Sequence, residues 1–158
     1  MCIFKTLEIM KNHEAIIRAY EGSDKSSLSS IWYRASLEAH SFLGEDRLQE
    51  QRRLIEDVYL EKAETWVAAI DGRPVGFIGL LDSFIGGLFV DPEVQGRGIG
   101  QILIHHALAL KGELSLEVYA YNERACRFYN HLGFKITGER AEDDDGLPFR
   151  NIQMELKG

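Results

Sequence analysis

The feature that most constrains the fold is a loop with three glycines at alternate positions, set between an apolar run and a helix-like pattern. The segment from Leu88 to Leu108 reads LFVDPEVQGRGIGQILIHHAL, and its glycines are Gly96, Gly98 and Gly100. The first N–H groups of a helix have no partner within it, and the helix dipole adds partial positive charge there. Glycines remove the side chains that would hold a ligand away. The segment therefore predicts a cradle for a diphosphate, with Arg97 adding charge.

The loop differs from two better-known phosphate loops. A P-loop needs Gly-Lys followed by Ser or Thr, and the chain has no such triplet. The dinucleotide fingerprint G-x-G-x-x-G needs a glycine at position 101, where Gln101 stands. From the loop alone, a tight structural turn without a ligand and an unrelated nucleotide-binding protein stay open as alternatives.

Charge and cysteine content narrow the classes of partner. The 158 residues carry a formal net charge of −7, which argues against nucleic acid and suits either solubility alone or a cationic substrate. No apolar run is long enough to span a membrane, so no membrane partner is expected. Two cysteines, Cys2 and Cys126, are too few for a disulfide framework, which makes the cytoplasm the expected compartment.

No metal site is expected from the sequence. His105 and His106 are adjacent, so they point to different faces of a helix. The run EDDDG at 142–146 lacks the spacing of an EF-hand loop, and we interpret it as a solvated turn.

Apolar periodicity predicts a strand, two helices, three strands, a helix, a strand, a helix and two strands. This order lacks the steady alternation of a doubly wound fold and predicts an α/β fold, an α+β mixed sheet flanked by helices. The expected strands are 14–20, 64–70, 73–81, 83–90, 114–121, 134–139 and 149–156, and the expected helices are 25–39, 46–60, 98–110 and 123–132.

Two further segments carry structural expectations. Gly86 and Gly87 lie within an expected strand and predict a β-bulge or a close backbone approach. Residues 1–13 have short apolar stretches broken by charges, and we expect a loosely ordered extension there, followed by a single domain over 14–158.

Two motifs together resemble the GNAT superfamily of N-acetyltransferases. The family's diphosphate motif, Q/R-x-x-G-x-G/A, matches Gln95 to Gly100, and NERACRFYNHLGF at 122–134 is similar to its N-x-x-A-x-x-F-Y-x-x-x-G-F segment. The element order extends the resemblance over roughly residues 15–156. It implies a GNAT-like acyl-CoA N-acyltransferase fold with splayed central strands. The chain also resembles small bacterial members described as protein-lysine acetyltransferases, partly through IWYRASLEAHSFL.

The resemblance implies acetyl-CoA as co-substrate, without a metal. The strand before the loop would offer main-chain groups of Leu88 and Val90 to the pantetheine arm, and the loop amides would hold the diphosphate. Asn122 would face the pantetheine or the departing thiol. The positions that the resemblance assigns to the cofactor are Leu88, Phe89, Val90, Gln95, Gly96, Arg97, Gly98, Ile99, Gly100, Gln101, Asn122, Ala125, Phe128 and Tyr129.

Acetyl transfer needs a neutral amine, a polarised thioester carbonyl and a proton for the departing thiolate. An alkylammonium has a pKa of about 10.4 in water, so a base, a water chain or desolvation must remove its proton. Tyr129, at the family's Phe-Tyr position, is the candidate acid, with aromatic packing as its alternative role. The strand at 83–90 has no carboxylate, so the candidate bases are Glu117 and His40; a cross-strand charge and a capping or surface histidine are their alternatives.

The sequence gives weaker indications of which groups polarise the thioester carbonyl and which residues bind the acceptor amine. The N–H of Val90 is a candidate for polarising the carbonyl. Trp32, Tyr33 and Phe42 are candidates for an acceptor pocket, although helical spacing places Trp32 in the core first.

The sequence thus predicts a cytoplasmic N-acetyltransferase that joins acetyl-CoA and a primary amine in a ternary complex. The acceptor is a small-molecule or peptide amine, and the protein is a monomer or homodimer. The alternative is a non-catalytic acyl-CoA-binding sensor or partner module, which the missing strand carboxylate favours and Tyr129 disfavours.

Overall fold

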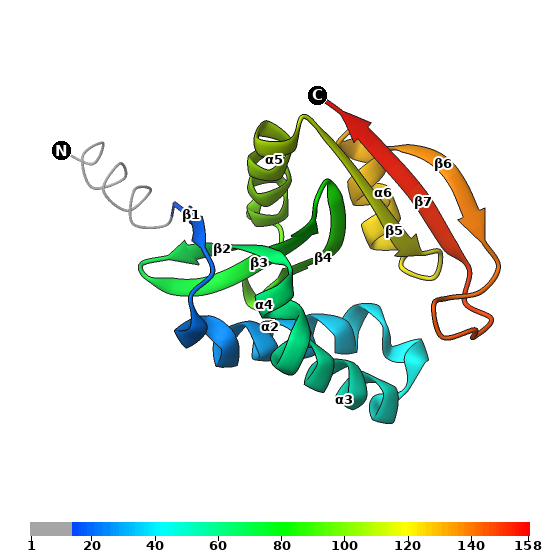
Figure 1. The fold of residues 1–158 in the computed structure, drawn as a ribbon, viewed down its shortest axis with the longest axis horizontal. Coiled ribbons are helices and arrows are strands. Elements are labelled where there is room, and N and C mark those ends of the chain that lie inside the picture. Colours follow the sequence, from blue (N-terminus) through cyan, green and yellow to red (C-terminus); the bar gives the residue numbers. More distant parts are fainter. Residues whose placement is uncertain (1–13) are drawn as a thin grey trace.

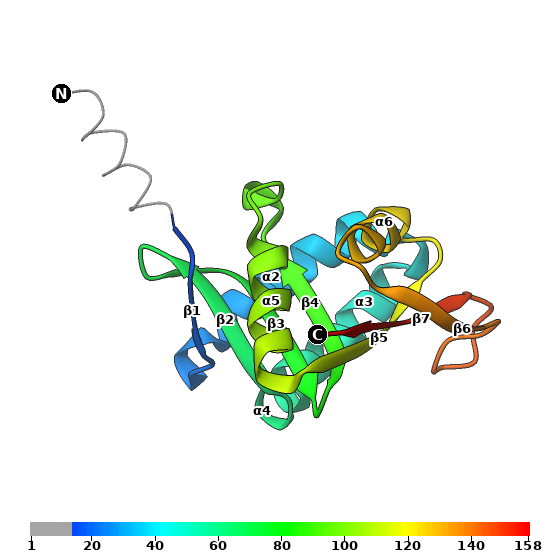
Figure 2. The same ribbon diagram turned by 90° about the horizontal axis from the view of Figure 1, so that it is seen from above.

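The computed structural model describes residues 14–158, which form a mixed sheet with helices on both faces (Figures 1 and 2). The extension expected over residues 1–13 lies outside the described residues. The seven strands follow the order β1-β2-β3-β4-β5-β7-β6, and the β4–β5 pair alone is parallel. The mixed sheet flanked by helices is therefore confirmed.

The elements follow the predicted order closely. The strands are β1 (Ile16–Ala19), β2 (Glu64–Ile70), β3 (Arg73–Leu81), β4 (Phe84–Val90), β5 (Glu113–Tyr119), β6 (Lys135–Arg140) and β7 (Asn151–Lys157). The helices are α2 (Lys25–Ala39), α3 (Glu45–Leu54), α4 (Leu60–Lys62), α5 (Ile99–Lys111) and α6 (Glu123–His131), with short turns η1 (Gly22–Asp24), η2 (Ser41–Leu43) and η4 (Pro92–Val94) and a π-helical segment η3 (Ile55–Tyr59). Within residues 14–158 no helix is long and apolar enough to cross a membrane.

The sheet separates two apolar cores. On β3, Phe77 is buried in the core that it shares with α2, α3 and α4, whereas its neighbour Ile78 is buried on the opposite face, in the core that includes α5 and α6. Central strands covered on both faces need apolar residues at successive positions. This explains why β3 is an almost continuous apolar run.

Asn122 and Gly133 lie at the two ends of α6 and have the residue types that commonly begin and end a helix, whereas Asp24 does not cap α2. The Asn122 side chain accepts a hydrogen bond from the N–H of Ala125 at 3.2 Å, and Gly133 has a φ of +100° just after α6. Asp24 precedes α2, but its side chain does not cap that helix. Its carboxylate instead accepts from the Arg18 guanidinium and so ties η1 to the end of β1.

The helix expected over 46–60 is interrupted. The α-helical α3 ends at Leu54, five π-helical residues follow, and α4 completes the segment. A π-helical turn widens the backbone spacing, which turns the following residues relative to a regular helix. Apolar periodicity over so short a segment cannot reveal the change.

The bulge expected in the third strand of the hairpin series is present in β4. Gly79 of β3 pairs with Gly87, and the next pair is Leu80 with Ile85, so Gly86 is the extra residue. The neighbouring strand β5 pairs with β4 only at Phe84 and Ile85. Beyond that point β4 and β5 diverge, which confirms the splayed central strands.

Candidate active site

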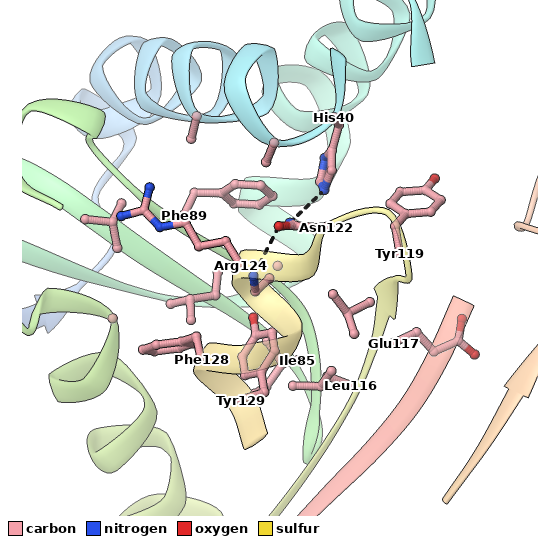
Figure 3. A pocket seen from close by; sticks show the side chains of 18 of the residues that line it. His40, Ile85, Phe89, Leu116, Glu117, Tyr119, Asn122, Arg124, Phe128 and Tyr129 are labelled. Atoms are coloured by element: carbon pink, nitrogen blue, oxygen red, sulfur yellow. Dashed lines mark hydrogen bonds between the residues drawn. The ribbon is translucent and has the colours of Figure 1, made fainter. Parts of the chain in front are cut away.

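A cleft of about 880 Å³ occupies the gap where β4 and β5 diverge (Figure 3). Of the residues expected from the sequence, the cleft brings together His40, Leu88, Phe89, Val90, Gln95, Gly96, Gly98, Ile99, Gly100, Gln101, Glu117, Asn122, Ala125, Phe128 and Tyr129. Arg97 does not line it and lies instead beside Arg73 in a smaller hollow near the β2–β3 hairpin.

The glycine loop enters α5 with its amides uncovered. Gly96 has a φ of +85° and Gly98 a φ of +79°, and a Cβ at either would meet no atom within 4 Å. Gly98 is the N-cap of α5, so free N–H groups of its first turn follow directly. Gly100 has a different role, because a Cβ there would lie 3.0 Å from the Phe128 ring on α6. The third glycine therefore allows α5 and α6 to pack closely.

Some main-chain groups of β4 face the cleft. The N–H of Asp91 donates to the Val75 carbonyl of β3 at 2.8 Å, and successive residues of a strand direct these groups to opposite sides. Leu88 and Val90 therefore direct theirs away from β3, toward the side where β5 no longer pairs. The Gln95 side chain already donates to the Val90 carbonyl at 3.3 Å. Both the loop and the strand thus present main-chain hydrogen-bonding groups to a ligand.

Tyr129 lies in α6 beneath this gap. Its ring packs edge-on against Phe128 and Phe134, with centroids 5.3 Å and 5.4 Å away, while its hydroxyl points into the cleft below Asn122 (Figure 3). Burial raises the pKa of Tyr129 above its ordinary value. The phenol is therefore protonated at neutral pH and can donate a hydrogen bond or a proton.

His40 and Asn122 meet above the same gap (Figure 3). The Asn122 oxygen accepts from Ala125, so its amide nitrogen faces His40 Nε2, at 3.4 Å. Burial lowers the pKa of His40 to about 4, so the imidazole is neutral at pH 7 and Nε2 can accept this bond. The ring of Tyr119 packs edge-on against His40, with centroids 5.2 Å apart. His40 is thus a half-buried residue that contacts Asn122, rather than an exposed surface histidine.

Glu117 lines the other end of the cleft. Its carboxylate accepts hydrogen bonds from Arg140 on β6 and from Gln153 on β7, the latter at 3.2 Å. In Figure 3 the carboxylate points away from Tyr129, toward these two strands. Glu117 is therefore a half-buried, ion-paired anion, and the structure does not bring it beside His40.

Arg124 is a cleft residue that the sequence analysis did not select. It is the second residue of α6, and Figure 3 shows its side chain extending from that helix across the cleft. Among residues 14–158, no ion pair engages it. Its position two residues after Asn122 was the available signal. An exposed guanidinium here can meet an anion held by the glycine loop.

The interpretation of EDDDG as a solvated turn is wrong for Asp143, which is only 6% exposed. Burial alone would raise the pKa of Asp143, but hydrogen bonds from the Leu147 N–H and from Arg47 hold that pKa below its ordinary value. Arg47 donates to Asp143 at 2.6 Å and to Asp145 at 2.7 Å, which ties α3 to the β6–β7 loop. Among the described residues, no cluster could hold a metal ion.

The three aromatic residues expected to line an acceptor pocket lie in different places and do not form one pocket. Trp32 is buried in the core, and Tyr33 lies outside the cleft under the Arg52 guanidinium. Phe42 instead joins a cluster with Tyr121 and Phe149, whose ring centroids lie 5.2 Å and 4.9 Å from it. Phe42 also packs against His40 and Tyr119, so this cluster borders the cleft at those two residues.

Comparisons with known proteins agree on one family. A model described as the acetyltransferase (GNAT) family matches residues 27–134. The peptidyl-lysine N-acetyltransferase YjaB of Salmonella typhimurium is 39% identical over 139 residues, which are 87% of this chain and 95% of that protein. The solution structure of apo-form YjaB from Escherichia coli, 35% identical, covers 90% of this chain and 97% of that chain with a TM-score of 0.83. The PaiA N-acetyltransferase of Thermoplasma acidophilum in complex with coenzyme A shares the fold, with a TM-score of 0.75 at 20% identity over 92% of this chain and 99% of that chain.

The half-buried, neutral His40 predicts that the stability of the protein depends on pH. Between pH 6.5 and about 4 the unfolded chain binds a proton at His40 that the folded chain does not, so stability is lost as the pH falls through this window. Urea unfolding at pH 7 and pH 4.5 should show the wild type losing about 2 kcal/mol more than His40→Phe. The exposed His131→Phe is the control and should lose as much as the wild type. Equal losses in all three proteins would contradict a buried, neutral imidazole.

Proposed function

The chain belongs to the acetyltransferase (GNAT) family, and on that premise we propose that it acetylates a lysine amine presented on a peptide. It is an acetyl-CoA-dependent N-acetyltransferase, in agreement with its family and with the names of its relatives. The observation that carries the proposal is the cleft at the β4–β5 divergence. One end of it presents uncovered amides, and the other end is acidic.

The residues of the first end fit acetyl-CoA. We place its diphosphate on the loop amides from Gln95 to Gly100, where Gly96 and Gly98 leave open space. The pantetheine arm then follows the main-chain groups of Leu88 and Val90, with Arg124 supplying a cation from the opposite wall. This placement puts the thioester between β4 and α6, near the Tyr129 hydroxyl.

The chemistry is a direct transfer within a ternary complex. The neutral amine nitrogen attacks the thioester carbon, the new C–N bond forms, and the C–S bond breaks to release the thiolate of CoA. We assign the proton that the thiolate takes up to Tyr129, whose raised pKa keeps the phenol protonated until then. The N–H of Val90 faces the gap and is our candidate for the carbonyl oxygen.

The two candidate bases receive different roles. We assign Glu117 to the acceptor, where its charge favours an ammonium and its carboxylate can accept the amine proton through water. We assign His40 to positioning, because its Nε2 accepts from Asn122 and its lowered pKa makes it a weak base. Asn122 in turn faces the pantetheine side of the cleft.

The acidic end supports a cationic acceptor. Carboxylates of Glu38, Glu117 and 143–145 line the cleft there, against the guanidinium groups of Arg47 and Arg140. The balance is negative, which favours a lysine ammonium over an anionic amine such as an amino acid. The relatives named peptidyl-lysine N-acetyltransferases point the same way.

Tyr129→Phe tests the acid. We expect it to lower kcat by about 100-fold, because the thiolate loses its proton donor. The Kd for acetyl-CoA should stay within about twofold, since the ring and its packing are kept. Stopped-flow or thiol-release kinetics and calorimetry measure both constants. Full turnover in this variant would remove Tyr129 from the acid role.

Arg124→Ala tests the cation at the diphosphate. We expect the Kd for acetyl-CoA to rise about tenfold and the Kd for S-acetylpantetheine, which has no diphosphate, to stay unchanged. Arg127→Ala is the matched control, because this neighbour on α6 is exposed and, within residues 14–158, forms an ion pair only with Glu123. If both arginine variants bind acetyl-CoA like the wild type, Arg124 has no part in phosphate binding.

An acceptor panel tests the proposed function itself. Acetyl-CoA is incubated with a lysine peptide, the same peptide without lysine, a polyamine and an amino sugar, and products are read by mass. We expect kcat/KM for the lysine peptide to exceed that of the other amines by about tenfold, and Glu117→Gln to reduce it. Acetyl-CoA binding without transfer to any amine would favour the non-catalytic binding module.

A further inference from the structure

Tyr59 is a half-buried residue that the proposed mechanism does not use. It ends the π-helical segment η3 on the face of the sheet covered by α2, α3 and α4. Its hydroxyl is inaccessible to solvent and has no hydrogen-bond partner among residues 14–158. An unpartnered buried hydroxyl calls for a reason, because such groups are usually hydrogen-bonded.

The phenol lies directly against the bulge of β4. A Cβ at Gly86 would lie 1.6 Å from Tyr59 Oη and 2.7 Å from its Cζ. A Cβ at Gly79, on the neighbouring strand β3, would lie 2.9 Å from Tyr59 Cε1. The two glycines therefore clear the space that the ring fills. This is the close backbone approach that the glycine pair of β4 predicted.

Gly86 also marks the point where the central strands β4 and β5 separate. Gly86 is the extra residue of the β4 bulge, and the last β4–β5 pair, Ile85 with Leu116, stands just before it. From Gly86 onward β4 runs along the cleft and no longer pairs with β5, and its Val90 carbonyl accepts a hydrogen bond from the Gln95 side chain instead. Tyr59 therefore contacts the backbone at the point where the gap between β4 and β5 opens.

We propose that Tyr59 is a positioning residue for acetyl-CoA: its phenol is a wedge that holds the β4 bulge in place and keeps the gap between β4 and β5 open. The proposal rests on the proposed function, because the gap is where the pantetheine arm is placed. The π-helical turn is part of the device, since it sets the direction in which Tyr59 leaves its helix.

The contact is steric rather than acid–base. Burial raises the pKa of Tyr59 to about 12, so the phenol is neutral across the physiological range. The hydroxyl neither lines the cleft nor bonds a described residue, which removes a direct role in proton transfer. The proposed role depends only on the close contact between the phenol of Tyr59 and the backbone at Gly86.

The first test removes the wedge. Tyr59→Ala should raise both the Kd for CoA and the KM for acetyl-CoA by about tenfold, because the gap is no longer held in the binding geometry. The kcat at saturating acetyl-CoA should stay within about threefold, since Tyr129 and the acidic end are unchanged. Val67→Ala, on β2 in the core beneath α2, α3 and α4, controls for lost stability and should leave the Kd unchanged. A wild-type Kd in a folded Tyr59→Ala protein overturns the proposal.

The second test adds a side chain at the bulge instead of removing the phenol. Gly86→Ala introduces a methyl group into the position of Tyr59 Oη and should weaken CoA binding by a similar factor. In the double variant Gly86→Ala with Tyr59→Ala the collision is absent, so the Kd should be no higher than that of Tyr59→Ala alone. Purely additive effects, or a Gly86→Ala protein that binds CoA like the wild type, contradict the wedge.

Failure of the wedge and failure of the proposed function can be told apart. If the wild type binds CoA and the Tyr59 and Gly86 variants bind it equally well, only the wedge is overturned. If the wild type itself does not bind CoA, both ideas are overturned. Tyr59→Phe, which keeps the ring and loses only the hydroxyl, should fold like the wild type and show an increase in Kd smaller than that of Tyr59→Ala.

Discussion

The structure depends on one interruption in a hydrogen-bonded ladder, the parting of β4 from β5 at Gly86. Unpaired main-chain groups in the middle of a sheet are unfavourable unless something bonds them. Here they border a cleft rather than solvent-free core, so a bound ligand can complete the ladder. The glycine loop follows on the same strand and continues the row of uncovered amides. The fold thus creates its binding site by leaving part of the sheet unfinished.

The two ends of the cleft differ in charge for a physical reason. The end at α5 offers helix N–H groups and Arg124, which favour the anionic part of a coenzyme. The end at the β6–β7 loop carries carboxylates held by Arg47 and Arg140, which keep the loop in place while the local balance stays negative. Tyr129 lies between the ends, where a coenzyme sulfur and an amine can meet.

The sequence predicted the structure best at positions where the backbone conformation requires a particular residue type. Gly96 and Gly98 adopt left-handed conformations, and Asn122 and Gly133 delimit α6, as their residue types predict. Features that depend on distant contacts were missed. The burial of Asp143 requires Arg47, which lies far away in the chain, and the position of Tyr59 depends on a π-helical turn that has no periodic signature. The role of Gly100 in helix packing was likewise hidden, because its partner Phe128 belongs to another helix.

NMR signals of the glycine-loop backbone amides, followed during two titrations, test most directly whether these amides bind the diphosphate of the coenzyme. One ligand is acetyl-CoA, and the other is S-acetylpantetheine, which lacks the diphosphate. If these amides hold the diphosphate, the signals of Gly96, Gly98 and Gly100 shift strongly with acetyl-CoA and little with S-acetylpantetheine, while signals of Leu88 and Val90 shift with both. Unchanged signals of the loop amides in a protein saturated with acetyl-CoA would contradict diphosphate binding by the glycine loop.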